Sequence, residues 1–173
     1  MATSAVIRSI QPGDVLSGLS TGGDPDIKPL KTFLRRHAAN YHVTNVAKTY
    51  AAFLPANPKK AVGYITLVCG EIATDPQLSN GDGFPYDHYP AVKIARLAVN
   101  SDLRGSGIGY QLTLLALGIV KEEICPRVGC RFVVLDAKQA SIPFYVRQGF
   151  VLLDTPDNLK REHPVMFLDL NKH

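Results

Sequence analysis

The segment from Arg104 to Gly109 reads Arg-Gly-Ser-Gly-Ile-Gly, with glycine at every second position after the arginine. Glycine adopts positive φ at little cost and lets another group approach the backbone closely. The segment separates an apolar strand-like run from an apolar helix-like run, and N–H groups at a helix start attract anions. It predicts a site for a pyrophosphate, or else a turn without a ligand. A nucleotide-kinase loop and a dinucleotide fingerprint are excluded, because neither the Lys-Ser/Thr pair nor the Gly-x-Gly-x-x-Gly spacing is present.

A second group of residues lies about forty positions downstream, where 143–150 reads Pro-Phe-Tyr-Val-Arg-Gln-Gly-Phe. Taken alone, Phe144 and Tyr145 would most often be core or surface aromatics. The phenol of Tyr145 has an ordinary pKa near ~10, so at neutral pH it is protonated and can serve as a general acid.

Taken together, the two segments resemble the GNAT superfamily of acyl-CoA N-acetyltransferases. The resemblance lies in Arg-x-x-Gly-x-Gly at 104–109, followed by Phe-Tyr-x-x-x-Gly-Phe at 144–150. The stretch IARLAVNSDLRGSGIG at 94–109 is similar to the cofactor-binding strand and loop of that family. Three further stretches resemble its toxin-type (TacT- or AtaT-like) branch, whose members acetylate the amino group of aminoacyl-tRNA: PLKTFLRRHAANYH (29–42), AVGYITLVCGEI (61–72) and YPAVKIARLAVN (89–100).

The resemblance implies acetyl-CoA as the acetyl donor and assigns roles to particular residues. The backbone N–H groups of Leu97, Ala98 and Val99 would bind the pantetheine arm and polarise the thioester carbonyl. Tyr145 would protonate the CoA thiolate. The pyrophosphate would be held by Arg104, Gly105, Ser106, Gly107, Ile108 and Gly109. Lys138 departs from the family, which often has asparagine seven residues before the tyrosine.

No general base stands out in the sequence. Glu71, at the end of a predicted strand, is the foremost side-chain candidate, and His42 and His88 are further ones. An α-amino group of an aminoacyl ester is weakly basic and needs no dedicated base, which is the alternative.

Positive charge gathers in the first third of the chain. Residues 1–60 hold eight basic and three acidic residues, whereas the remainder holds eleven basic and twelve acidic ones. A basic face attracts polyanions such as nucleic acid, and Arg35 and Arg36 are the expected phosphate contacts. The leading hypothesis is therefore aminoacyl-tRNA as acceptor. The alternatives are a small-molecule or protein amine with a merely solvated basic helix, and a CoA-binding module without catalysis. The toxin resemblance further implies a homodimer and a cognate antitoxin protein.

The hydrophobic pattern predicts an α/β (α+β) fold with a mixed, mostly antiparallel GNAT-type sheet flanked by helices, in one domain over 1–173. Expected strands are 5–10, 46–54, 61–69, 91–99, 131–136, 150–153 and 165–170. Expected helices are 27–42, capped by Asp26, then 107–124, apolar nearly all round, and 142–148, stopped by Gly149. A long polar loop is expected over 75–90.

Composition excludes several other classes of protein. The chain has 173 residues, of which 46% are hydrophobic and 20% charged, as in a globular domain rather than a disordered one. The longest apolar run is too short to span a membrane, and the N-terminus does not read as a signal peptide. Three cysteines, an odd and sparse number, argue against a disulfide scaffold and a zinc site. A cytoplasmic protein without a metal is expected.

Overall fold

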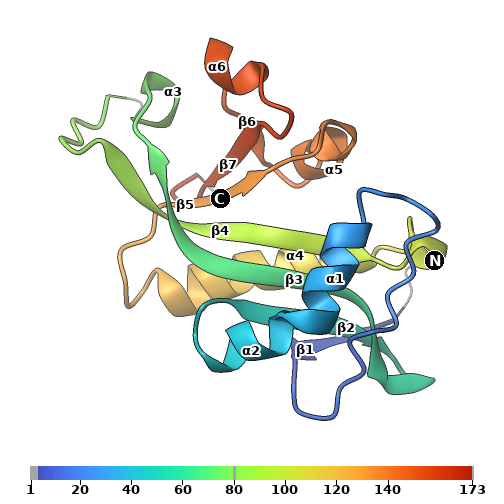
Figure 1. Ribbon diagram of the computed structural model, residues 1–173. Coiled ribbons are helices and arrows are strands. Elements are labelled where there is room, and N and C mark those ends of the chain that lie inside the picture. Colours follow the sequence, from blue (N-terminus) through green and yellow to red (C-terminus); the bar gives the residue numbers. More distant parts are fainter. Residues whose placement is uncertain (1–3, 80, 173) are drawn as a thin grey trace. The chain divides into compact units, whose positions relative to one another are not determined.

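The computed structural model describes residues 4–79 and 81–172 of the chain (Figure 1). In this part of the chain, seven strands form one sheet in the order β1-β2-β3-β4-β5-β7-β6. The strands are β1 (Val6–Ser9), β2 (Lys48–Leu54), β3 (Asn57–Ala73), β4 (His88–Val99), β5 (Phe132–Asp136), β6 (Val151–Leu152) and β7 (Val165–Asp169). The helices are α1 (Lys28–Arg36), α2 (Ala38–Val43), α3 (Pro76–Ser79), α4 (Ile108–Gly118), α5 (Ile142–Val146) and α6 (Pro156–Leu159).

The sheet is mixed and mostly antiparallel, which confirms the fold predicted from the sequence. Strand β2 pairs antiparallel with β1 and β3, and β7 pairs antiparallel with β5 and β6. Strands β4 and β5 pair in parallel, with Ala91 opposite Phe132 and Ile94 opposite Leu135. A parallel pair needs a crossover connection, and α4 lies in that connection.

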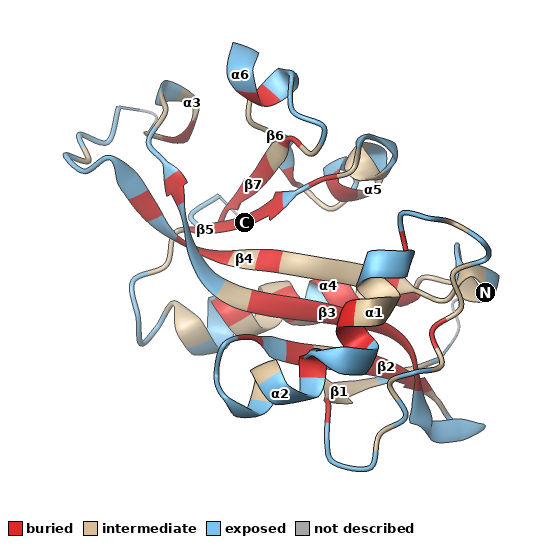
Figure 2. Ribbon diagram, in the orientation of Figure 1, coloured by how far each residue is buried: buried red, intermediate tan, exposed pale blue. Residues whose placement is uncertain are grey.

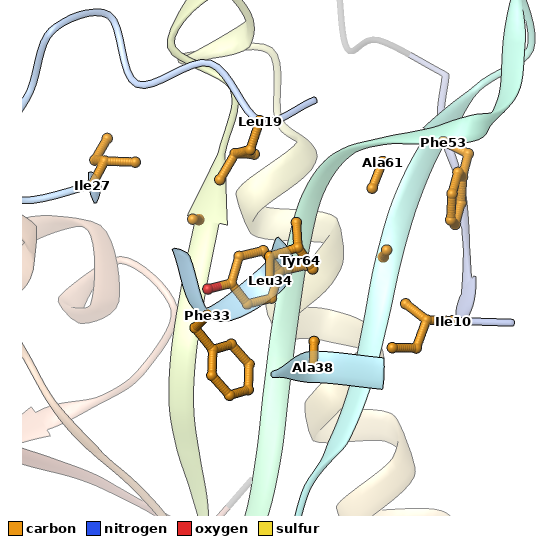
Figure 3. Close-up of a cluster of buried hydrophobic side chains, with 11 residues drawn as sticks. Ile10, Leu19, Ile27, Phe33, Leu34, Ala38, Phe53, Ala61 and Tyr64 are labelled. Carbon is orange, nitrogen blue, oxygen red and sulfur yellow. The ribbon is translucent and has the colours of Figure 1, made fainter. Parts of the chain in front are cut away.

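The chain divides into two compact units, and the boundary falls within β3, β4 and α4. The first unit contains the residues up to Val68 together with Ala95–Ala116. Its core lies between the helices α1 and α2 and the strands, where Phe33, Leu34 and Tyr64 gather (Figure 3). Gly63, which directly precedes Tyr64 on β3, faces the opposite side of the sheet, toward α4. A Cβ added to Gly63 would lie 3.3 Å from the side chain of Ile108. Helices therefore cover both faces of this part of the sheet.

The second unit contains Cys69–Ile94 and the residues from Leu117 onward. Its apolar core includes Tyr89 and Ala91 of β4, Phe132 of β5 and Phe167 of β7. The rings of Phe132 and Phe167 meet edge to face at 5.9 Å. Strand β3 belongs to both units, and Figure 2 shows a buried middle stretch between its more exposed ends.

The first predicted helix differs from the structure in two ways. It is broken at His37, whose φ of −123° ends α1 before α2 begins. It also starts later, because Ile27 rather than Asp26 is the N-cap and no side chain caps it. Asp26 uses its N–H to donate to the Asp24 carboxylate at 2.9 Å, so the local turn is organised by Asp24. The prediction of Asp26 as the cap is therefore wrong.

The second predicted helix and the long loop also contain unpredicted detail. The helix is α-helical over α4 and continues as a π-helical turn over Ile119–Ile124. It is not buried all round, since Tyr110 and Leu114 are 49% and 47% exposed. The segment 75–90 holds α3 and the first residues of β4; its residue 80 lies outside the described residues. No helix in the described ranges is long and apolar enough to cross a membrane.

Candidate active site

The glycine-rich segment folds as the sequence predicts, into a turn that leads into α4. Gly105 and Gly107 have φ of 78° and 86°, in the left-handed region that favours glycine. A Cβ added to Gly105 would meet no atom within 4 Å, so the space above its backbone is open. Because the first N–H groups of an α-helix have no partner within the helix, the start of α4 offers donors beside this open space, whereas the Ser106 N–H in the turn donates to the Leu103 carbonyl at 3.2 Å.

The buried hydroxyl of Ser106 is a second feature of this turn that suits a diphosphate. The hydroxyl oxygen of Ser106 is buried, and within the described residues it has no hydrogen-bond partner. A buried hydroxyl without a partner costs free energy, and a phosphate oxygen would accept its hydrogen bond. The neighbouring guanidinium of Arg104 is half-exposed and already holds the carboxylate of Asp24 at 3.0 Å. The predicted pyrophosphate residues are thus brought together, with Asp24 as an unpredicted partner.

Residues Leu97, Ala98 and Val99 form the end of β4, beyond the residues that pair with β5. The register with β5 ends at Ile94, whereas β4 continues to Val99. Ala98 is buried in the core of the first unit. The backbone of β3 approaches closely here, because a Cβ added to Gly63 would lie 3.1 Å from the Ala98 carbonyl oxygen. The Asn100 N–H donates to the Val62 carbonyl of β3 at 2.8 Å, so the N–H groups able to bind an extended ligand are those on the opposite edge of β4, beyond its register with β5.

Tyr145 lies in α5, in the second unit, and is held there by its own backbone. Its carbonyl accepts hydrogen bonds from the N–H groups of Gln148 at 2.9 Å and Phe150 at 3.1 Å. The chain turns between them at Gly149, with φ of 89°. The ring packs edge-on against Phe144 and Phe150, with centroid distances of 5.0 and 5.7 Å. These contacts explain why the Gly-Phe pair follows the tyrosine in the sequence.

Burial changes the acid–base chemistry of this phenol. Tyr145 is 8% exposed, and burial raises its pKa to about 12. No contact in the described part of the chain gives its hydroxyl a hydrogen-bond partner. Tyr145 is therefore protonated at neutral pH and able to donate a hydrogen bond.

Helix α1 is more basic than the net charge of the whole chain, +4, suggests. Its nine residues include Lys28, Lys31, Arg35 and Arg36 and no acidic residue. Arg35 and Arg36 are exposed in its last turn, where cations also interact favourably with the helix dipole. Two other basic residues of the first third are engaged internally. Arg8 binds Asp14 with two hydrogen bonds of 2.8 Å, and Lys48 Nζ donates to the His42 carbonyl and to Asn45 Oδ1.

Two of the three candidate bases lie near each other. His88 Nε2 is 3.9 Å from a carboxylate oxygen of Glu71, and both side chains are exposed. His42 is different, because both of its ring nitrogens are engaged. Its Nδ1 accepts the N–H of Thr49 at 3.0 Å, so its Nε2 carries the proton and donates to Ser9 Oγ at 3.0 Å. His42 is thereby a structural residue that ties α2 to β1 and β2.

A cavity of about 490 Å³ lies entirely within the second unit. Its apolar lining includes Ile72, Val134, Leu135, Leu153 and Val165, and its charged lining is Glu71, Lys93, Asp136, Asp157 and Arg161. Asp136 accepts hydrogen bonds from both Lys93 and Arg161. Three carboxylates against two cations leave the lining with a negative balance.

The sequence analysis missed several polar residues of these regions. Lys93 reaches the cavity, and Arg96 lies over the ring of Phe33, 3.8 Å from its centroid. Both stand inside the apolar run Ala91–Val99, and a charged residue in a buried strand is the signal that would have identified them. No such signal exists for Asp24, because its partner is eighty residues away.

Comparison with known proteins finds a match to one family. The model of the acetyltransferase (GNAT) family matches residues 34–150. Similar solved structures include a tyrosine-to-phenylalanine mutant of KacT, with a TM-score of 0.84 and 22% identity, covering 98% of this chain and 97% of that one. AtaT complexed with acetyl-methionyl-tRNAfMet has a TM-score of 0.82 and 22% identity, covering 98% and 96%. A mutant AtaT toxin bound to the C-terminus of the antitoxin AtaR and acetyl-CoA has a TM-score of 0.76 and 20% identity, covering 97% and 94%.

Proposed function

Because the chain belongs to the acetyltransferase (GNAT) family, we propose that it transfers the acetyl group of acetyl-CoA to the α-amino group of aminoacyl-tRNA. The observation that carries this choice of acceptor is the likeness in fold to AtaT complexed with acetyl-methionyl-tRNAfMet, which extends over 98% of this chain. The basic surface of α1 supports it independently. Such a transfer would block translation, as expected of a toxin.

The donor side uses residues of the first unit. Acetyl-CoA supplies an activated acyl group as a thioester. The N–H groups of Gly105, Gly107, Ile108 and Gly109, the hydroxyl of Ser106 and the guanidinium of Arg104 bind the diphosphate. The N–H groups of Leu97, Ala98 and Val99 bind the pantetheine arm and donate to the carbonyl oxygen, which becomes negative as the amine attacks.

Tyr145 acts on the leaving group. Its hydroxyl remains protonated at neutral pH and donates to the sulfur as negative charge develops there. In this role Tyr145 only has to donate a hydrogen bond, and the packing of its buried ring holds the hydroxyl in place.

The acceptor side uses the exposed end of α1. Arg35 and Arg36 bind phosphates of the acceptor, so that binding weakens steeply with salt. The variant Arg35→Gln/Arg36→Gln is expected to raise KM for the tRNA and to lower the salt slope by about one to two. Lys59→Gln/Lys60→Gln is the matched control, since it removes the same charge from exposed residues of β3.

The decisive experiment incubates the protein with labelled acetyl-CoA and total aminoacylated tRNA, with small amines and peptides in parallel. Label in the tRNA fraction, lost when the aminoacyl ester is hydrolysed, supports the proposal. Label only in small amines or peptides refutes the choice of acceptor. A rate that does not change with ionic strength also counts against a polyanionic acceptor.

A small amine is the second candidate acceptor, and the cavity of the second unit favours it. Its volume of about 490 Å³ lies in the ~300–1,000 Å³ range of small-ligand pockets. An aliphatic amine is an ammonium ion at neutral pH, and the carboxylates of Glu71 and Asp157 would attract it while the apolar lining holds its carbon atoms. Replacement of Glu71 by glutamine would then raise KM for the amine.

A homodimer and a cognate antitoxin complete the proposal. Tyr110 and Leu114 stand one helical turn apart on α4, and each is about half exposed. Aromatic and large aliphatic side chains on one helix face suit a protein contact. Sedimentation of the purified protein tests the dimer, and co-purification from its native operon tests the antitoxin.

A further inference from the structure

The segment between Leu19 and Ile27 is hydrogen-bonded to Asn100 and Ser101, which precede the glycine-rich turn. Ser20 donates its N–H to Asn100 Oδ1 at 2.7 Å, and its carbonyl accepts the N–H of Ser101 at 3.2 Å. The hydroxyls of Ser20 and Ser101 are 2.8 Å apart. Leu19 and Ile27 themselves are buried in the core of the first unit. The segment is therefore anchored at both ends and in the middle.

Close packing fixes this contact further. A Cβ added to Gly22 would lie 2.8 Å from the Cβ of Ser101, so no larger residue fits there without a shift. Gly22 and Gly23 both have positive φ, 58° and 80°. The segment thus follows one path, and that path brings Asp24 to Arg104.

The donors that orient the carboxylate of Asp24 include Asp26 and Arg104. Asp24 Oδ1 accepts the N–H of Asp26 at 2.9 Å, and its Oδ2 accepts from Arg104 Nη2 at 3.0 Å. The ion pair is open to water, with 53% of the Arg104 side chain and 35% of the Asp24 side chain exposed. An exposed ion pair is weak, since solvent screens it. A diphosphate carries more charge and can bind a guanidinium through two oxygens.

We infer that Asp24 is a counter-ion for Arg104 in the protein without cofactor, and that it competes with the diphosphate of acetyl-CoA and so sets the affinity for it. The inference rests on the proposed role of Arg104 in diphosphate binding. The Asp24 carboxylate occupies the guanidinium, so this ion pair must break before a phosphate oxygen can take its place. Release of Asp24 is therefore part of cofactor binding, and the segment that carries it leads directly into α1.

The variant Asp24→Asn separates charge from structure. Asparagine keeps an oxygen that accepts the N–H of Asp26, so the turn is retained while the negative charge is lost. We expect it to bind CoA up to about five times more tightly than the unaltered protein, because the diphosphate no longer has to displace one exposed ion pair. Asp26→Asn, with the same change of charge two residues away, is the matched control and is expected to change the affinity by less than about twofold.

The test is calorimetric titration of the unaltered protein and its variants with CoA, which requires no turnover. In the background Arg104→Gln, the effect of Asp24→Asn should disappear, because the shared partner is gone. The inference is overturned if Asp24→Asn weakens binding, which would make Asp24 a positioning residue, or if its effect persists without Arg104. Equal affinity of the Asp24→Asn variant and the unaltered protein overturns it as well. Failure of the unaltered protein to bind CoA overturns the proposed cofactor site together with this inference, and is distinguishable because all variants then fail alike.

Discussion

Replacement of Tyr145 by phenylalanine removes one oxygen atom and leaves the packing of the ring unchanged. Burial raises the pKa of Tyr145 to about 12, whereas an alkyl thiol has a pKa near ~8.5. Complete proton transfer from this phenol to a thiolate is then uphill by roughly 5 kcal/mol. Tyr145 is therefore expected to stabilise the developing thiolate chiefly by donating a hydrogen bond.

Whether Tyr145 donates only a hydrogen bond or a whole proton determines how much kcat falls in Tyr145→Phe. A hydrogen bond to a charged group contributes about 1.5–3 kcal/mol, which corresponds to a loss of roughly 10- to 150-fold in kcat for Tyr145→Phe. A role as a full proton donor would give losses toward the upper end of ~10²–10⁴. Since the hydroxyl has no partner within the described residues, the stability should change by less than about 0.5 kcal/mol.

The assay measures kcat and the KM for acetyl-CoA by detecting released thiol, beside the unfolding temperature. Tyr64→Phe is the matched control, because Tyr64 is also buried but donates to the Leu30 carbonyl at 2.8 Å. It should lose about 1 kcal/mol of stability, or roughly 2–4 °C in Tm, without a comparable loss of kcat. If Tyr145→Phe retains kcat within twofold, the phenol is not the donor. If its activity falls only because the protein unfolds, the role assigned to its hydroxyl is also wrong.

Three further predictions concern stability. Burial, and then the charge of Lys48, lower the pKa of His42 below 6.5 in the folded protein, so as pH falls below about 6.5 the unfolded chain gains a proton first; the urea midpoint should drop between pH 7 and 5, and less steeply in His42→Gln. Asn158→Ala removes two hydrogen bonds donated to the carbonyls of Leu153 and Val165 and one accepted from the Val165 N–H, so equilibrium unfolding should show a loss of about 3 kcal/mol. Gly105→Ala should cost about 1 kcal/mol through its positive φ, whereas Gly129→Ala, in equally open space, should not; equal losses would exclude backbone strain as the cause.

The strands and the cofactor turn were predictable because their signals are local. Alternating and continuous apolar runs identify strands, and the expected strands 46–54 and 61–69 appear as β2 and the middle of β3, which pair with each other. Glycines at alternate positions predicted the turn, and two of them adopt positive φ there. The structure adds what no local pattern contains, such as the open space over Gly105 and the buried hydroxyl of Ser106.

The break between α1 and α2 was not predictable, because no glycine or proline marks it. The apolar spacing continues through His37, and Phe33 and Tyr41 on either side meet edge to face at 5.7 Å. Ala38 is fully buried directly after the break. The break is therefore accompanied by burial of Ala38 and by ring packing across it, and local helix propensity contains neither of these tertiary contacts.

Two charged residues lie within the apolar run of β4, and the sequence alone did not show their roles. Lys93 and Arg96 stand in a strand otherwise suited to burial, where an unpaired charge is costly. In the structure each has a partner from a distant segment: Asp136 for Lys93, and the ring of Phe33 for Arg96. A charge in a buried strand thus indicates a partner elsewhere in the fold, although the sequence does not say which. Since Lys93 lines the cavity and Arg96 contacts the basic helix α1, this signal leads to both regions proposed for the acceptor, which the family motifs alone do not mark.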